Sequence, residues 1–199
     1  MSGAGDHRAG ARPRQPAPGF TLLELLFTMT LMIIVAGIAV PQTRTGLDRA
    51  RAIAAARSLA HLCAVARFQA VGRARHVAVQ FTPGGDDFTM QLFADGNRNG
   101  VRTSDIRSAL DPPLSLRTAL SADYPGVRIA LDPGIGLGSD PVRLSGSSLL
   151  SFSPAGTATA GTVYVLGRDG TQLAVRVLGV TGRTRVLRYE RSTGSWERP

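Results

Sequence analysis

One apolar stretch decides the architecture of this chain. Residues 19–41 read GFTLLELLFTMTLMIIVAGIAVP, and the only ionisable side chain between Phe20 and Val40 is Glu24. A helix rises about 1.5 Å per residue, so a helix of this length crosses a hydrocarbon core of about 30 Å. The stretch therefore predicts a transmembrane helix over residues 20–41. A carboxylate inside such a helix is unfavourable, so Glu24 is expected to have a partner or a function.

Glu24 also has a local interpretation. Thr21 and Glu24 have the spacing of a capping box, in which two side chains bond the free backbone amides of the first helical turn. The helix dipole also stabilises a carboxylate in that turn. A cap in the monomer is compatible with another role in an assembly, so both interpretations stay open.

The remaining composition fits one soluble domain. The chain has 199 residues and a formal net charge of +9, and its 23 basic residues are all arginine. Arginine binds carboxylates and phosphates through parallel hydrogen bonds, but the charge by itself identifies no partner. Arginines also flank the apolar stretch on both sides, so the positive-inside rule leaves its orientation open. Cys63 is the single cysteine, which excludes an intrachain disulfide.

Residues 42–72 predict an amphipathic helix that continues the membrane segment. Ala55, Leu59, Leu62 and Ala66 recur at helical spacing, which places them on one face. Gly72 is the expected end of this helix.

Residues 73–199 predict a β-rich globular domain. Alternating residues 76–81 and 88–93, around a turn at residues 83–86, predict a hairpin. Further strands are predicted at residues 127–131, 149–152, 162–166, 173–180 and 185–189. Glycine and proline separate these strands at short spacing, as in an antiparallel sheet with meander connections. The predicted fold class is α+β, with one long N-terminal helix packed on an antiparallel sheet.

A polar loop at residues 95–100, DGNRNG, has the spacing that opens a calcium loop. The twelfth position is Ile106 instead of a bidentate glutamate, and the flanking residues are strand-like. A turn whose side chains bond their own backbone is therefore the favoured interpretation. No metal site is expected.

No catalytic grouping is evident in the sequence. His61 and His76 lack a carboxylate or cysteine at ligand spacing, and no serine, histidine and aspartate can be grouped. The glycines of residues 134–138 lack the dinucleotide-binding spacing. We expect neither enzymatic activity nor a cofactor.

Two segments resemble a known family. Residues 19–25, GFTLLEL, followed by an apolar helix, resemble the processing site of type IV pilins and of type II secretion pseudopilins. Residues 151–156, SFSPAG, and residues 180–185, VTGRTR, resemble the end of the GspH/FimT family of minor pseudopilins and minor pilins. The loop at residues 95–100 is also similar to a loop in that family.

The resemblance implies a processed membrane protein. Prepilin peptidase would remove the leader, residues 1–19, by cutting between Gly19 and Phe20 on the cytoplasmic side, and the new amine of Phe20 would be methylated. Glu24 would then engage the terminal amine of a neighbouring subunit during assembly. Pro18 departs from the basic residue that is common before the glycine.

The resemblance also implies a location and partners. The protein would be a single-pass protein of the bacterial inner membrane, with its C-terminal domain in the periplasm. Its partners would be other pseudopilins or pilins, the inner-membrane assembly platform, prepilin peptidase and membrane lipid. It would join a type II secretion pseudopilus, which serves protein secretion, or the tip of a type IV pilus.

Residues 182–185, GRTR, match a pattern with which some FimT-type pilins bind DNA during natural transformation. Arginines two residues apart on an extended segment face the same side, so Arg183 and Arg185, with Arg188 nearby, can contact successive phosphates. Tyr189 and Trp196 can stack on single-stranded bases or serve as packing anchors. The alternatives are a solvated strand face without DNA binding, and a periplasmic binding domain on an uncleaved membrane anchor.

Overall fold

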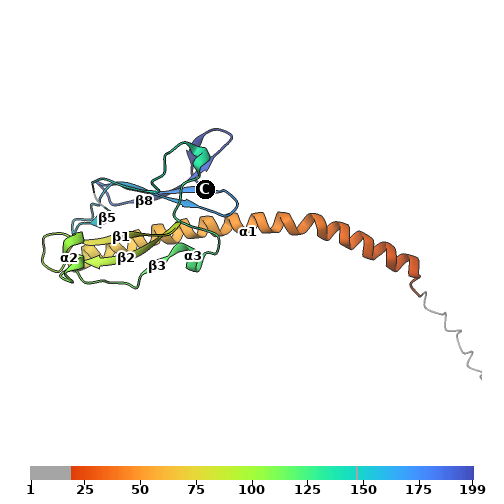
Figure 1. The fold of residues 1–199 in the computed structure, drawn as a ribbon, viewed down its shortest axis with the longest axis horizontal. Coiled ribbons are helices and arrows are strands. Elements are labelled where there is room, and N and C mark those ends of the chain that lie inside the picture. Colours follow the sequence, from red (N-terminus) through yellow and green to blue (C-terminus); the bar gives the residue numbers. More distant parts are fainter. Residues whose placement is uncertain (1–18, 147) are drawn as a thin grey trace, which may run out of the picture. The chain divides into compact units, whose positions relative to one another are not determined.

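The computed structural model describes residues 19–146 and 148–199, apart from the side chains of residues 39–43. The predicted leader therefore lies outside the described residues, except for Gly19. The chain divides into two compact units, residues 1–42 and 43–199. The long helix α1 (Leu22–Arg73) contributes to both units (Figure 1).

In the first unit, the structure describes mainly the N-terminal part of α1. The hydroxyl of Thr21 accepts a hydrogen bond from the backbone amide of Glu24 at 3.2 Å, which is one half of the predicted capping box. The large apolar side chains from Phe20 to Ile38 are exposed. Among the described residues, no helix is both long and apolar enough to span a membrane. The predicted span over residues 20–41 is thus not confirmed, and residues 39–41 belong to the stretch without described side chains.

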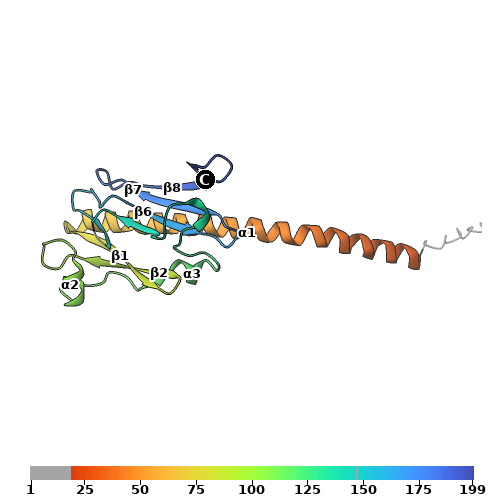
Figure 2. The ribbon, with the colours of Figure 1, turned by 45° about the horizontal axis from the view of Figure 1, so that its top comes forward.

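The second unit confirms the α+β class. The C-terminal part of α1 packs one face against two antiparallel sheets (Figure 2). Sheet A has the order β3-β2-β1-β5, and sheet B has the order β4-β6-β7-β8-β9. The strands of sheet A are β1 (Val77–Gly84), β2 (Asp87–Ala94), β3 (Thr118–Ala119) and β5 (Leu149–Phe152). The strands of sheet B are β4 (Val142–Leu144), β6 (Gly161–Leu166), β7 (Gln172–Val177), β8 (Thr184–Glu190) and β9 (Ser195–Glu197).

One hydrophobic cluster joins α1 to both sheets. Alternate residues of the strands face it, such as Val77 and Val79 in β1 and Val163 and Val165 in β6. The helix contributes Leu59 and a set of small, fully buried residues: Ala52, Ala55, Ala56, Ala66 and Ala70. Small side chains let the helix backbone approach the strands closely.

Two sequence predictions for this unit are confirmed. In the predicted helical face, Ala55, Leu59 and Ala66 are buried and Leu62 is half-buried. In the predicted hairpin, Gly84 pairs with Asp87, and Gly85 completes the turn with a positive φ of 70°.

Two other predictions are wrong. The strands form two sheets instead of one, because β4 and β6–β9 pair separately from β1, β2, β3 and β5. Residues 127–131 form only an isolated bridge between Arg128 and Leu166. The next amide, of Ile129, donates to the Asp87 carboxylate at 2.9 Å, so a side chain takes the place of a strand partner.

Three short helices complete the unit. They are α2 (Thr103–Arg107), α3 (Leu120–Asp123) and the 3-10 helix η1 (Pro133–Ile135). All three lie in connections between strands, where the sequence pattern predicted no helix.

Candidate anion-binding surface

The predicted processing and assembly residues lie at the start of α1. Phe20 is exposed, and Glu24 is exposed in the first helical turn. Within the described residues, the Glu24 carboxylate has no hydrogen bond and no ion pair.

The predicted arginines lie around the turn that leads into β8. Residues 178–183 form this turn through hydrogen bonds from the Gly182 amide to the Leu178 carbonyl and from the Leu178 amide to the Arg183 carbonyl. Gly182 has a positive φ of 59°, and a Cβ atom there would lie 2.4 Å from the Gly156 carbonyl oxygen. The turn therefore requires glycine. It holds Arg183 next to β8, and both Arg183 and Arg185 are exposed.

Arg188 does not join this pair, because it lies on the other face of β8. Successive side chains of a strand point to opposite faces, and Arg188 shares its face with Val186, which packs against the core. The Arg188 guanidinium lies 3.1 Å from the Glu190 carboxylate. Its Nε atom is buried and has no hydrogen-bond partner within the described residues.

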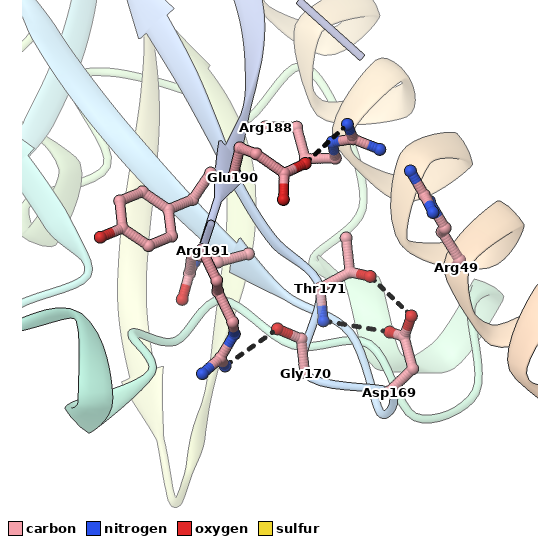
Figure 3. A pocket seen from close by; sticks show the side chains of 9 residues that line it. Arg49, Asp169, Gly170, Thr171, Arg188, Glu190 and Arg191 are labelled. Carbon is pink, nitrogen blue, oxygen red and sulfur yellow. Dashed lines mark hydrogen bonds and ion pairs between the residues drawn. The ribbon is translucent and has the colours of Figure 1, made fainter. Parts of the chain in front are cut away.

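Arg188 instead lines a polar pocket between α1 and sheet B, with a volume of about 200 Å³ (Figure 3). Figure 3 shows its guanidinium extending toward Arg49 of α1. The pocket also contains the carboxylate of Asp169, which accepts hydrogen bonds from the amide and the hydroxyl of Thr171. Arg191 at its rim pairs with Asp132. The carboxylates of Asp169, Glu190 and Asp132 thus offset most of the positive charge of the three arginines, so this pocket is a poor anion site.

Sheet B also carries arginines that the sequence motif did not indicate. The register aligns Arg143 of β4, Thr162 of β6, Arg176 of β7 and Arg185 of β8 in one row across the sheet. This row faces away from the core, and Arg176 and Arg185 are exposed. A groove of about 430 Å³ lies beside Arg143 and Arg176.

The arginine row, defined as Arg143, Arg176 and Arg185, is electrostatically unfavourable for the sheet. Arg176 and Arg185 are direct cross-strand neighbours, and like charges in that position repel each other. Such a pair becomes favourable when a polyanion lies across both guanidiniums. The row can therefore bind successive anionic groups, whereas Arg183 lines a groove together with Phe68 and Val71 of α1.

The C-terminal aromatic residues pack against one another. The Trp196 ring lies 5.3 Å from that of Tyr189 and 5.7 Å from that of Tyr164, measured between centroids. Arg143 lies over the Tyr164 ring at 5.5 Å. Trp196 is thus an anchor that holds β9 on sheet B, as one of the two predicted interpretations has it.

The loop at residues 95–100 is organised by carboxylates that bind backbone amides. Asp95 is only 1% exposed and accepts hydrogen bonds from the amides of Arg98 (2.6 Å) and Gly100 (2.9 Å). Asp111, also 1% exposed, accepts from the amides of Gly96 (2.9 Å) and Arg102 (3.0 Å). The prediction of a turn that bonds its own backbone is confirmed.

Asp105 is a further organiser of this loop, and the sequence pattern did not indicate it. Its carboxylate accepts hydrogen bonds from the side chains of Asn97, Ser104 and Asn99. These hydrogen bonds, that of Asn97 first, lower the pKa of Asp105 below its ordinary value. The asparagines that suggested calcium ligands thus donate to a carboxylate through their amide nitrogens.

Cys63 lies in the core on the buried face of α1. Burial raises the pKa of its thiol to about 12, so the thiol stays protonated and unreactive at neutral pH.

Comparison with known proteins identifies the family. A family model described as type II transport protein GspH matches residues 55–182. No curated protein and no solved structure gave a significant match. The matched residues are more than half of the chain, and they extend from the buried face of α1 to the turn at Gly182. On this basis, the chain belongs to the GspH family of type II transport proteins.

Proposed function

We propose that the chain is a minor pseudopilin that is processed between Gly19 and Phe20 and assembled into a type II secretion pseudopilus or a type IV pilus tip. Residues 20–41 anchor it in the inner membrane before assembly, and residues 43–199 form its periplasmic domain. Glu24 pairs with the terminal amine of the next subunit.

An exposed apolar surface on the first part of α1 supports this proposal independently of the family match. The exposed apolar side chains from Phe20 to Ile38 form a long surface that water solvates poorly. Lipid before assembly, and the helices of neighbouring subunits after it, would both cover that surface. The Glu24 carboxylate has no partner within the described residues, so an amine from another subunit would satisfy it.

Mass measurement of the protein purified from membranes tests the processing step. The expected mature chain begins at Phe20 and carries one added methyl group. In the variant Gly19→Val we expect the leader to be retained, because a side chain replaces the glycine before the cut. A wild-type chain with an intact N-terminus would contradict the proposal and favour an uncleaved anchor.

Glu24→Ala tests the assembly step separately. This variant is expected to be processed normally and to enter the filament about tenfold less, since it loses a charge pair in a poorly hydrated environment. Thr21→Val is the matched control, because it removes the hydroxyl that caps the helix and keeps the carboxylate. Equal loss in both variants would assign Glu24 to the helix cap instead.

The arginine row supports a second candidate function, DNA binding of the FimT type. Arg176 and Arg185 repel each other across the sheet unless an anion lies between them, and Arg183 is exposed two residues before Arg185. Contacts to a few phosphates would give weak binding that does not depend on sequence and decreases steeply with salt.

Fluorescence anisotropy with short single- and double-stranded DNA tests this candidate, using the full chain in nanodiscs of zwitterionic lipid. If DNA binds, the variant Arg183→Ala/Arg185→Ala should reduce the slope of log K against log salt by about 2. Arg107→Ala/Arg117→Ala is the matched control, because it removes the same charge from exposed positions outside sheet B. The absence of binding at low salt would leave the secretion role.

A further inference from the structure

The solvent-facing side of α1 in the second unit carries a regular seam. Its positions are spaced alternately by three and four residues, which is the repeat of a helix that packs along another helix. The seam consists of Leu47, Ala50, Ala54, Arg57, His61, Ala64, Phe68 and Val71. All of these side chains are exposed except Ala54, which is partly exposed.

The ends of the seam are apolar and unusually exposed. Phe68 is 76% exposed, Val71 is 51% exposed and Leu47 is 49% exposed. Phe68 and Val71 also line a groove of about 510 Å³, with Arg67 and Arg183 at its edge. Apolar side chains aligned in this way bury their surface when a second helix covers them.

The centre of the seam determines the charge of the covering helix. Arg57 and His61 have no hydrogen bond and no ion pair within the described residues. Covering an arginine without a counter-charge is strongly unfavourable. The covering helix must therefore bring a carboxylate to the level of Arg57 and His61, and Arg183 favours acidic residues at its end.

A second copy of this chain does not meet this requirement. In a parallel pair in register, Arg57 would lie against Arg57. In an antiparallel pair centred on the seam, Leu47 would lie opposite Val71, and Arg57 opposite His61. The one acidic residue of α1 between residues 43 and 73 is Asp48, which lies off the seam and pairs with Arg51 at 3.3 Å.

We infer that the seam of α1 binds an amphipathic helix of a different protein, with apolar residues along its own seam and acidic residues opposite Arg57 and His61. The inference deepens the proposed function, because it names the face and the chemistry with which this subunit meets an unlike one. It does not depend on processing or on DNA binding, so it can fail while either of them holds.

Three synthetic helical peptides of about four heptads test the inference. They share one alanine and leucine seam and carry glutamate, glutamine or lysine at the two central seam positions. Binding to the full chain in zwitterionic nanodiscs is measured by fluorescence anisotropy, with empty nanodiscs as the blank. The glutamate peptide is expected to bind about tenfold more tightly than the lysine peptide.

Charge reversal and truncation make this test specific. The variant Arg57→Glu/His61→Glu is expected to prefer the lysine peptide, and Phe68→Ser is expected to weaken every peptide. Leu116→Ser is the matched control, because Leu116 is 85% exposed and is not part of the seam. Equal binding of the three peptides, or binding that Phe68→Ser leaves unchanged, would overturn the inference. Sedimentation that shows a wild-type dimer dissociated by Phe68→Ser would overturn it in favour of a second copy.

Discussion

At the scale of single residues, two buried carboxylates hold a long connection in place. Asp95 and Asp111 together accept four hydrogen bonds from backbone amides within residues 96–102. A charged acceptor makes each of these bonds stronger than one between neutral groups. The connection from β2 to α2 thus depends on side chains where a sheet would supply backbone partners.

Asp95→Ala is expected to lower the free energy of unfolding by about 2–3 kcal/mol, because it leaves two amides without an acceptor. Urea unfolding followed by circular dichroism measures the change. Asp86→Ala is the matched control, with an expected change within about 0.5 kcal/mol, because the Asp86 carboxylate is 88% exposed. Equal effects of the two substitutions would show that the hydrogen bonds accepted by Asp95 do not stabilise the fold.

The lowered pKa of Asp105 gives the same loop a dependence on pH. A carboxyl group with a lowered folded pKa stabilises the fold above its unfolded pKa. This stabilisation decreases as the pH falls below the unfolded pKa and is lost below the lower, folded pKa. Acid should therefore loosen this loop through Asp105.

At the scale of elements, the buried face of α1 sets its distance from both sheets. Ala56 is fully buried on this face, whereas Ala64 is exposed on the same helix. Ala56→Leu is expected to destabilise the fold by about 1–3 kcal/mol by overpacking, and Ala64→Leu is expected to have little effect. Thermal unfolding of both variants measures the contrast. Equal tolerance of leucine at the two positions would show that the helix can move away from the strands.

Local signals explain which elements could be predicted. The β1–β2 hairpin has its turn residues within the sequence that forms it, and the helical face repeats within a few turns. The division into two sheets could not be predicted, because alternation tells which side of a strand is buried and not which strand it pairs with. Residues 127–131 have the right alternation, but Asp87 takes the place of their partner.

The candidate anion-binding surface also has a part that the sequence predicted and a part that only the structure shows. Arg183 and Arg185 could be found from a four-residue motif, whereas Arg143 and Arg176 join them only through the register of four strands. Arg188 lies apart from Arg183 and Arg185, contrary to the prediction, because odd and even residues of a strand face opposite sides. The seam of α1 was not predicted, because the exposure of its residues depends on where both sheets lie.

At the scale of the whole molecule, positive charge gathers where this protein would meet others. The chain carries a net charge of +9, and the α1 seam and the arginine row both present exposed arginines, namely Arg57, Arg176 and Arg185. Acidic partners are therefore favoured on both surfaces, and salt would weaken both interactions.

The interleaving of the two sheets has a consequence for how the domain acquires its structure. The chain leaves sheet A after β3, enters sheet B at β4, returns to sheet A at β5 and ends in sheet B. Gln80 thus pairs with Leu149, so β1 gains its second neighbour only after most of the domain has been synthesised. Neither sheet is a continuous segment that can fold first, and such distant pairings make folding slow. A chain that is still emerging from translocation would expose its β1–β2 hairpin without its full set of neighbours, and the domain would fold as one late, cooperative step.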